Sequence, residues 1–145
     1  MKHGITSLLA IGQRMEDGTV YAGISPDTGK PMYALPGDAP LTMKWKQAME
    51  YAAAFEGHGH PQGTFRVPTK DELNVLFQNE AQIGGFKTTG SAPARYYWSS
   101  SACYWSPTKT ETHPLAHYAW NQSFYDGRPF WNNKNNESAL RLVRS

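Results

Sequence analysis

The chain has one cysteine, little charge and no long apolar run, and each absence excludes a class of protein. Cys103 is the only cysteine among 145 residues, so no intramolecular disulfide can form. No segment approaches the ~20 apolar residues of a membrane-spanning helix, and we expect a soluble protein without membrane insertion. The apolar run at residues 8–11 is shorter than that of a secretory signal. The expected locations are the cytoplasm, a virion, or the outside of the cell after non-standard export.

Charge is sparse as well. Charged residues make up 18% of the chain, and the formal net charge is +2. Lysine and arginine occur singly rather than in clusters or stripes, so we expect no nucleic-acid partner. The 13 glycines and 10 prolines predict many turns without the low complexity of a disordered chain. The length predicts a single domain over residues 1–145 with its own core.

The chain is instead rich in aromatic residues near its C-terminus. Residues 96–131 hold 11 of the 19 Phe, Trp and Tyr, interspersed with Ser, Asn and Gly, and the run NNKNN follows at residues 132–136. Protein cores are normally filled with Leu, Ile and Val, whereas large rigid rings beside small polar groups are typical of binding surfaces. The pattern therefore predicts a recognition face rather than a catalytic centre.

The first 38 residues are predicted to be a β-hairpin region. Residues 8–11 are expected to form the first strand, and residues 19–24 and 30–35 a hairpin around the turn SPDTG at 25–29. The tripeptide DTG is also the signature of aspartic proteases. Its position in a turn favours the structural interpretation.

Two helices are predicted next. Thr42 is expected to cap a helix over residues 42–56, and Thr69 and Glu72 form a capping box at the start of a second helix. Residues 80–95 are predicted to be a loop. Short strands are then expected at residues 96–100, 118–124 and 139–143, which gives an α+β order. The expected core side chains are Trp45, Leu73, Leu76, Phe77, Trp98 and Trp120.

No catalytic or metal-binding set stands out. His58 and His60 are separated by one residue and could share a metal, but structural zinc sites need four ligands and catalytic ones usually three. The carboxylates of Asp71 and Glu72 are explained by helix capping. We therefore expect no metal, no cofactor and no enzymatic activity.

Six segments, in order, resemble the C-terminal domain family of bacterial collagen-like adhesins. They are Trp45 with Ala48, RVPTKDELN at 66–74, IGGF at 83–86, YWSSS at 97–101, AWNQSFYDG at 119–127 and LRLVR at 140–144. The resemblance covers residues 42–145 and implies a C-type-lectin-like fold near the formylglycine-generating-enzyme type. In that fold, two helices pack on short, mostly antiparallel strands with long loops. Residues 96–145 would form the ligand-binding region.

The same fold serves as the variable protein of diversity-generating retroelements, in which adenines at the 3′ end of a gene are randomised. An AAY asparagine codon can then become Tyr, Ser, Asp, His, Phe, Arg or Cys, but not Trp or Lys, so Trp131 and Lys134 would be fixed. Cys103 is a further candidate variable position. The predicted ligand-binding residues are Tyr104, Ser106, Tyr118, Ser123, Tyr125, Asp126, Arg128, Phe130, Asn132, Asn133, Asn135 and Asn136.

Two other functions stay open at this point. A carbohydrate adhesin would use aromatic platforms for sugar rings and basic side chains for sulfates. Its candidates are Lys109, Arg128, Lys134, Arg141 and Arg144. An enzyme of the formylglycine-generating type works with a cysteine pair, which this chain lacks. The expected partner is an unknown protein or carbohydrate on a cell surface, and the oligomeric state is left open.

Overall fold

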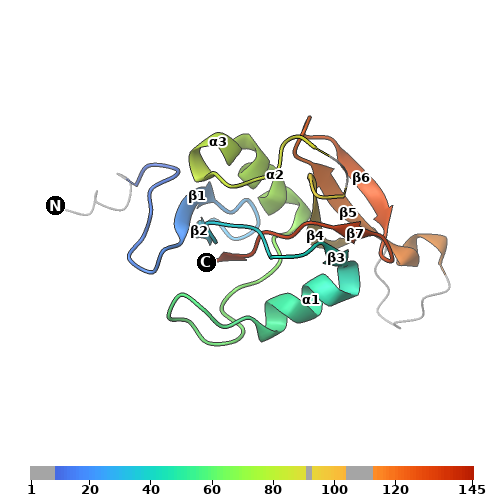
Figure 1. Ribbon diagram of the computed structural model, residues 1–145, viewed down its shortest axis with the longest axis horizontal. Helices are drawn as coiled ribbons and strands as arrows, with labels where there is room; N and C mark the ends of the chain where they lie inside the picture. Colours follow the sequence, from blue (N-terminus) through green and yellow to red (C-terminus); the bar gives the residue numbers. More distant parts are fainter. Residues whose placement is uncertain (1–8, 91–92, 104–112) are drawn as a thin grey trace.

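The computed structural model describes residues 9–90, 93–103 and 113–145 (Figure 1). Its strands are β1 (Val20–Ile24), β2 (Pro31–Ala34), β3 (Met43–Lys44), β4 (Tyr96–Ala102), β5 (Tyr118–Ser123), β6 (Pro129–Asn133), β7 (Glu137–Ser138) and β8 (Val143–Arg144), and its helices are α1 (Trp45–Ala54), α2 (Lys70–Gln78), α3 (Glu80–Ile83) and the 3₁₀ turn Pro114–His117. The strands form three small sheets, ordered β1-β2-β8, β3-β7 and β4-β5-β6. All pairs of strands within them are antiparallel. The result is a mixed α/β fold of the expected class.

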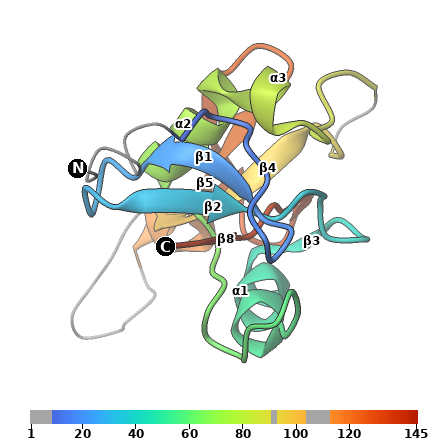
Figure 2. The same cartoon turned by 90° about the vertical axis from the view of Figure 1, so that its left-hand side faces the viewer.

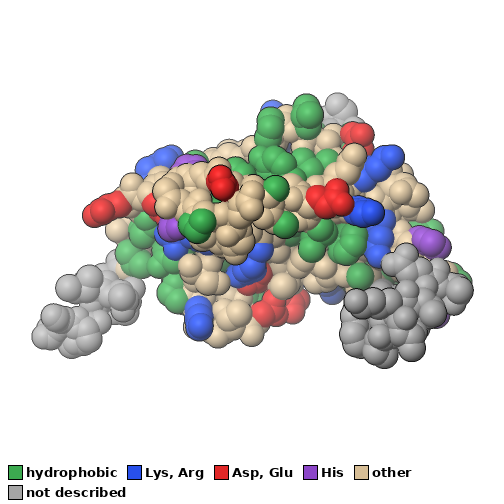
Figure 3. Space-filling view, turned by 90° about the horizontal axis from the view of Figure 1, so that it is seen from below, with side chains coloured by type: hydrophobic (Ala, Val, Ile, Leu, Met, Phe, Trp, Pro, Cys, Tyr) green, Lys and Arg blue, Asp and Glu red, His purple; other side chains and the backbone are tan. Residues whose placement is uncertain are grey.

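The sheets lie between the helices. In Figure 1, α2 and α3 lie above β1 and β2, and α1 lies below β3 and β4, while Figure 2 shows β8 beside β2. On the face seen from below, basic and acidic side chains are interspersed (Figure 3). Within the described residues, no helix is long and apolar enough to cross a bilayer.

The predicted hairpin is confirmed, but the predicted first strand is wrong. Strands β1 and β2 pair from Val20↔Ala34 to Ile24↔Pro31. Residues 9–11 form no strand. The first backbone contact with β1 comes instead at Gly12, whose amide donates to the Tyr21 carbonyl at 2.8 Å.

Helix α1 begins three residues later than predicted. Thr42 does not cap it, because its hydroxyl donates to the Glu137 side chain at 2.9 Å. Residues 43–44 are drawn into β3 by pairing with β7. The helix therefore starts at Trp45, and the Gln47 side chain accepts a bond from the Lys44 amide at 3.0 Å. A strand pairing that spans about 95 residues decides this boundary, and local sequence does not reveal it.

The capping box of α2 is confirmed. The Thr69 hydroxyl accepts from the Glu72 amide at 3.2 Å, and the Glu72 carboxylate accepts from the Thr69 amide at 3.0 Å. The predicted loop after α2 is wrong for residues 80–83, which form α3 and bury Ile83. The single helical turn of α3 is stabilised because it buries Ile83 in the core next to β1.

The C-terminal segment runs through the centre of the molecule. Residues 139–143 were predicted to be a strand, but the observed strand, β8, begins only at Val143. All five residues are buried, so both faces of this segment are covered. The Trp98 backbone amide donates to the Ala139 carbonyl at 3.0 Å, and the Leu35 backbone amide donates to the Leu142 carbonyl at 3.0 Å. The extended segment thus satisfies its backbone groups against several neighbours.

Alternate side chains of this segment enter two cores. Leu140 and Leu142 pack with Trp98 on the α1 side, whereas Ala139 and Val143 join the core beneath α2. Of the predicted core residues, Trp98, Leu73 and Leu76 are fully buried, and Trp45 and Phe77 pack at the margins. Trp120 is a correction: it is half-buried and belongs to neither core.

Candidate functional site

The exposed end of the β4-β5-β6 sheet carries the candidate site. Its register places Trp120 opposite Trp131 and Gln122 opposite Pro129, so these four side chains share one face. The two indoles meet edge to face, with ring centroids 5.7 Å apart. Trp131 is 53% exposed. Strand β6 lies at the edge of the sheet, and its first three residues, 129–131, are exposed on both of its faces.

A tight turn before β6 presents further rings. Tyr125 is 64% exposed, and the Arg95 guanidinium lies 5.4 Å from its ring and 5.6 Å from that of Tyr96. Phe130 stacks nearly parallel on Tyr96 at 5.7 Å. We call the exposed side chains of this turn and strand the β6 rim. Its members are Tyr125, Asp126, Arg128, Phe130 and Trp131.

Gly127 fixes the shape of this turn. Its φ is +83°, its amide donates to the Ser123 carbonyl at 2.8 Å, and a Cβ at this position would collide with the Phe77 ring. Exchange for any other residue therefore adds backbone strain to a steric clash.

The Gly127→Ala variant is expected to lose about 2 kcal/mol or more of unfolding free energy, measured by urea denaturation. Gly29→Ala is the matched control, because Gly29 also has a positive φ of +72° but open space around it. That control is expected to lose only about 1 kcal/mol, from backbone strain. Equal losses in the two variants would contradict the close contact with Phe77.

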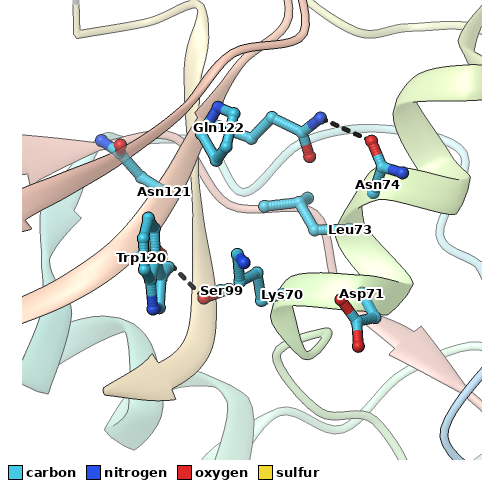
Figure 4. A pocket seen from close by; sticks show the side chains of 9 residues that line it. Lys70, Asp71, Leu73, Asn74, Ser99, Trp120, Asn121 and Gln122 are labelled. Carbon is cyan, nitrogen blue, oxygen red and sulfur yellow. Dashed lines mark hydrogen bonds between the residues drawn. The ribbon is translucent and has the colours of Figure 1, made fainter. Parts of the chain in front are cut away.

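A pocket of about 220 Å³ lies between α2 and β5 (Figure 4). Lys70, Leu73 and Asn74 line it from the helix, and Trp120 and Gln122 line it from the sheet. The Lys70 ammonium lies 4.4 Å from the centroid of the Trp120 ring. Gln122 donates to the Asn74 side chain and to the Gly127 carbonyl, both at 2.9 Å.

The asparagine run builds the turn between β6 and β7. The Asn135 backbone amide donates to the Asn133 side chain at 2.9 Å, and the Asn136 side-chain amide donates to the Asn132 side chain at 2.8 Å. A second groove, of about 370 Å³, lies beside this turn and is lined by Lys44, Lys46 and Lys134 among others. The Lys134 ammonium lies 4.5 Å above the Trp45 ring.

The predicted ligand-binding residues fall into four groups. Tyr125, Asp126, Arg128, Phe130, Asn135 and Asn136 are exposed, and Tyr118, Asn132 and Asn133 are half-buried. Ser123 is only 3% exposed, and its hydroxyl accepts from the Tyr125 amide at 3.3 Å, so it supports the turn from within. Tyr104 and Ser106 lie outside the described residues, as does Lys109.

Sequence reasoning missed three side chains of this region. Trp120 was assigned to the core, Trp131 was set aside because of its codon, and Lys70 was not considered. The signal for the two tryptophans was available, because a hairpin around residues 124–128 places them opposite each other. No local pattern indicates Lys70, which comes from a distant helix.

The alternative basic sites are mostly occupied by internal contacts. Arg141 cannot meet a sulfate, since it is completely buried and pairs with Asp38 at 2.9 Å. Arg144 pairs with Asp17 at 2.8 Å. Asp17 also bonds His60 at 2.8 Å. Burial alone would raise the pKa of the Asp17 carboxyl, but hydrogen bonds from Thr19 and His60 hold it well below its usual range.

Catalytic features are weak in the part of the chain that the structure describes. It contains no group of three or more His, Cys, Asp or Glu side chains that could hold a metal ion. Burial raises the pKa of the Cys103 thiol, which therefore stays protonated at neutral pH. Glu72 is committed to capping α2 and to an ion pair with Arg66.

The model of the Lcl C-terminal domain family matches residues 25–144, which are 120 of the 145 residues. This family is not an enzymatic one. A comparison with curated proteins found no significant match. The long family match is consistent with the resemblance to a C-terminal domain family seen in the sequence, and the chain belongs to the Lcl C-terminal domain family.

Proposed function

We propose that the chain is a non-catalytic recognition module, in which a C-type-lectin-like scaffold presents the β6 rim to a ligand. One observation carries the proposal. The described residues expose six large hydrophobic side chains, and three of them, Tyr125, Phe130 and Trp131, lie within seven residues of one another. Phe130 and Trp131 project from opposite faces of β6, so the rim exposes aromatic side chains on both faces of this edge strand. Exposed apolar patches rimmed by polar groups mark interaction sites. Membership of an adhesin-like family supports the same function.

The fold separates the rim from the residues that stabilise the molecule. Phe124 is 1% exposed and packs against Phe77 and Tyr97 directly below the turn. Tyr125, the next residue, points outward. Within the described residues, the only aromatic or cation–π contact of its ring is with Arg95. Exchange of such outward side chains usually changes stability by less than ~0.5 kcal/mol, whereas a few aromatic anchors can dominate a binding energy.

Replacing Tyr125 or Trp131 by alanine is expected to weaken ligand binding at least tenfold, the loss typical of an aromatic anchor worth about 1.4 kcal/mol or more. Ligands would be found by screening the full chain against a panel of neutral, sialylated and sulfated glycans and a displayed random-peptide library. Ile24→Ala is the matched control, because Ile24 is 48% exposed but lies on β1, away from the rim. Loss of binding in the control alone would contradict the proposal.

We further propose that the rim varies between copies of the gene, as in targets of diversity-generating retroelements. Tyr125, Asp126, Arg128 and Phe130 are exposed residues that randomised AAY codons can encode. The test is the gene itself. A near-identical repeat downstream, differing only at adenines and accompanied by a reverse-transcriptase gene, would support variation, and an isolated gene would contradict it.

A second candidate function is binding of an acidic glycan in the groove beside the β6–β7 turn. Three lysines, Lys44, Lys46 and Lys134, line this groove together with Trp45. Basic side chains beside an aromatic ring suit sulfated sugars. Binding at this groove would weaken strongly between about 0.05 and 0.5 M salt and would be lost in Lys44→Met/Lys46→Met. Binding that is indifferent to salt would exclude it.

A further inference from the structure

The pocket between α2 and β5 is sized for one ring. Its volume of about 220 Å³ is smaller than the ~300–1,000 Å³ of typical small-molecule sites. One wall is the half-buried indole of Trp120, and the side chain of Leu73 lies toward the interior (Figure 4). An indole wall packs against the C–H face of a sugar or against another flat ring. Shape alone thus admits either a pyranose or an aromatic group.

The Gln122 amide places a hydrogen-bond acceptor in this pocket. Its nitrogen must face the Gly127 carbonyl, 2.9 Å away, because a carbonyl only accepts. The same nitrogen donates to the Asn74 side chain at 2.9 Å. The orientation of the amide is thereby fixed, and its oxygen points toward Leu73 (Figure 4). That oxygen is available to a hydroxyl group of a ligand.

The charges around the pocket balance. Lys70 supplies one positive charge, and Asp71, exposed at the same margin, supplies one negative charge. A pocket with no net charge gains little from a charged ligand but offers both a donor and an acceptor to hydroxyl groups. The Lys70 ammonium lies over the Trp120 ring at 4.4 Å, and this cation–π contact is weak at a solvent-accessible site. A ligand hydroxyl could replace it as the ammonium's partner.

We propose that this pocket binds a single neutral pyranose, with its C–H face on Trp120, one hydroxyl donating to the Gln122 oxygen and another accepting from Lys70. The proposal rests on the recognition function above and names the ligand class of one part of the surface. A ring of about a dozen non-hydrogen atoms supports a Kd on the order of 1 mM. Tighter natural binding would come from a longer glycan that also contacts the β6 rim.

The test is a titration of the full chain with methyl pyranosides of galactose, mannose and glucose, followed by saturation-transfer NMR and tryptophan fluorescence. Saturable binding of at least one pyranoside, with a Kd on the order of 1 mM, is expected. Methyl glucuronide tests the charge argument, and p-cresol tests the aromatic alternative. Both are expected to bind more weakly than the preferred neutral sugar.

Variants locate the site. Trp120→Leu is expected to abolish sugar binding, and Lys70→Met, a change at a half-buried side chain, is expected to weaken it severalfold without affecting folding. Ile24→Ala is the control, since Ile24 is 48% exposed on β1 and does not line the pocket. Near-UV circular dichroism checks that each variant is folded. If Trp120→Leu fails to fold, Lys70→Met decides the outcome.

Three results would overturn the proposal. They are no binding of any pyranoside at 50 mM, stronger binding of p-cresol or of the glucuronide than of every neutral sugar, and binding that survives both Trp120→Leu and Lys70→Met. Each result would leave the recognition function of the β6 rim standing, because that function is tested by Tyr125→Ala with macromolecular ligands. Conversely, loss of the rim function would leave monosaccharide binding in the pocket measurable.

Discussion

Replacing Arg141 by methionine is expected to lower the free energy of unfolding by about 3–5 kcal/mol, because it leaves the Asp38 carboxylate largely buried without its cation. The Arg141 side chain is completely buried, and its Nε donates to Asp38 at 2.9 Å. It also donates to the carbonyls of Leu35 and Gly84, at 3.1 and 3.0 Å. Since domains of this size are stable by about 5–15 kcal/mol, the expected loss is a large share of the total.

The pH dependence of the variant provides a second readout. Burial raises the pKa of Asp38 above its ordinary value, and the Arg141 charge opposes that rise. Without Arg141, the folded state favours the protonated carboxyl still more. A raised folded-state pKa contributes stability at low pH that is lost as the pH rises through that pKa. The stability gap between the variant and the wild type is therefore expected to narrow as the pH falls toward about 4.

Urea denaturation at pH 7 measures the effect, with Arg128→Met as the matched control. The Arg128 side chain is 76% exposed and lies 3.5 Å from Asp126, so its loss is expected to change stability by less than ~0.5 kcal/mol. The double variant Asp38→Asn/Arg141→Met is expected to recover part of the loss, because the uncompensated carboxylate is gone. A loss of less than about 1 kcal/mol in Arg141→Met would contradict this account of the buried pair.

Glu72→Gln is expected to cost a similar amount, about 3–5 kcal/mol. Glu72 is 1% exposed and accepts two bonds from Arg66, one from the Ser25 hydroxyl at 2.6 Å and one from the Thr69 amide at 3.0 Å. A glutamine has a single acceptor oxygen, and its NH₂ group would face donors of Arg66. The change therefore breaks the connection between α2, the β1–β2 turn and the segment before α2.

Acid should remove the stability that the ionised Glu72 carboxylate contributes to the wild type. Burial alone would raise the pKa of Glu72, but the bonds from Arg66 and Ser25 lower it below its ordinary value. A lowered folded-state pKa contributes stability that is present above the unfolded-state pKa, about 4.3, and is lost as the pH falls below it. Glu72→Gln is thus expected to show a shallower loss of stability in acid than the wild type.

Asp71→Asn is the matched control for Glu72→Gln. Asp71 lies in the same first turn of α2 but is exposed, so it contributes at most the ~0.3–1 kcal/mol of a charge near a helix start. Unfolding in urea at several pH values would compare the two variants. Equal losses would show that the bonds of Glu72 add nothing beyond the helix dipole.

Short-range features of this fold could be predicted from the sequence. The β1–β2 hairpin and the Thr69–Glu72 capping box involve residues close together in the chain, and their side chains encode the local geometry directly. Both predictions are confirmed.

The errors share a cause, which is contact between distant residues. Thr42 bonds a side chain 95 residues away, and Arg141 bonds Asp38, 103 residues away. The alternation of residues 139–143 indicated one buried and one half-covered face, yet two separate cores bury both faces. Local pattern shows that a residue is apolar or charged, but not whether a remote segment covers it.

The candidate site was predictable to a similar extent. The aromatic and polar mixture correctly placed Tyr125 and Phe130 on an exposed segment, because the turn that presents them is local. The pocket beside them was not predictable, since Lys70 and Trp120 are 50 residues apart and meet only through the packing of α2 on the sheet.

Hydroxyl-radical footprinting of the full chain, with and without a ligand selected from the glycan panel or the peptide library, tests the recognition face most directly. Aromatic side chains are readily oxidised, so the method reports on them individually. Bound ligand is expected to protect Tyr125, Phe130 and Trp131 from oxidation, while exposed residues away from the rim, such as Leu41, react at an unchanged rate. Protection of Leu41 or Ile24 with no change at the β6 rim would contradict this expectation.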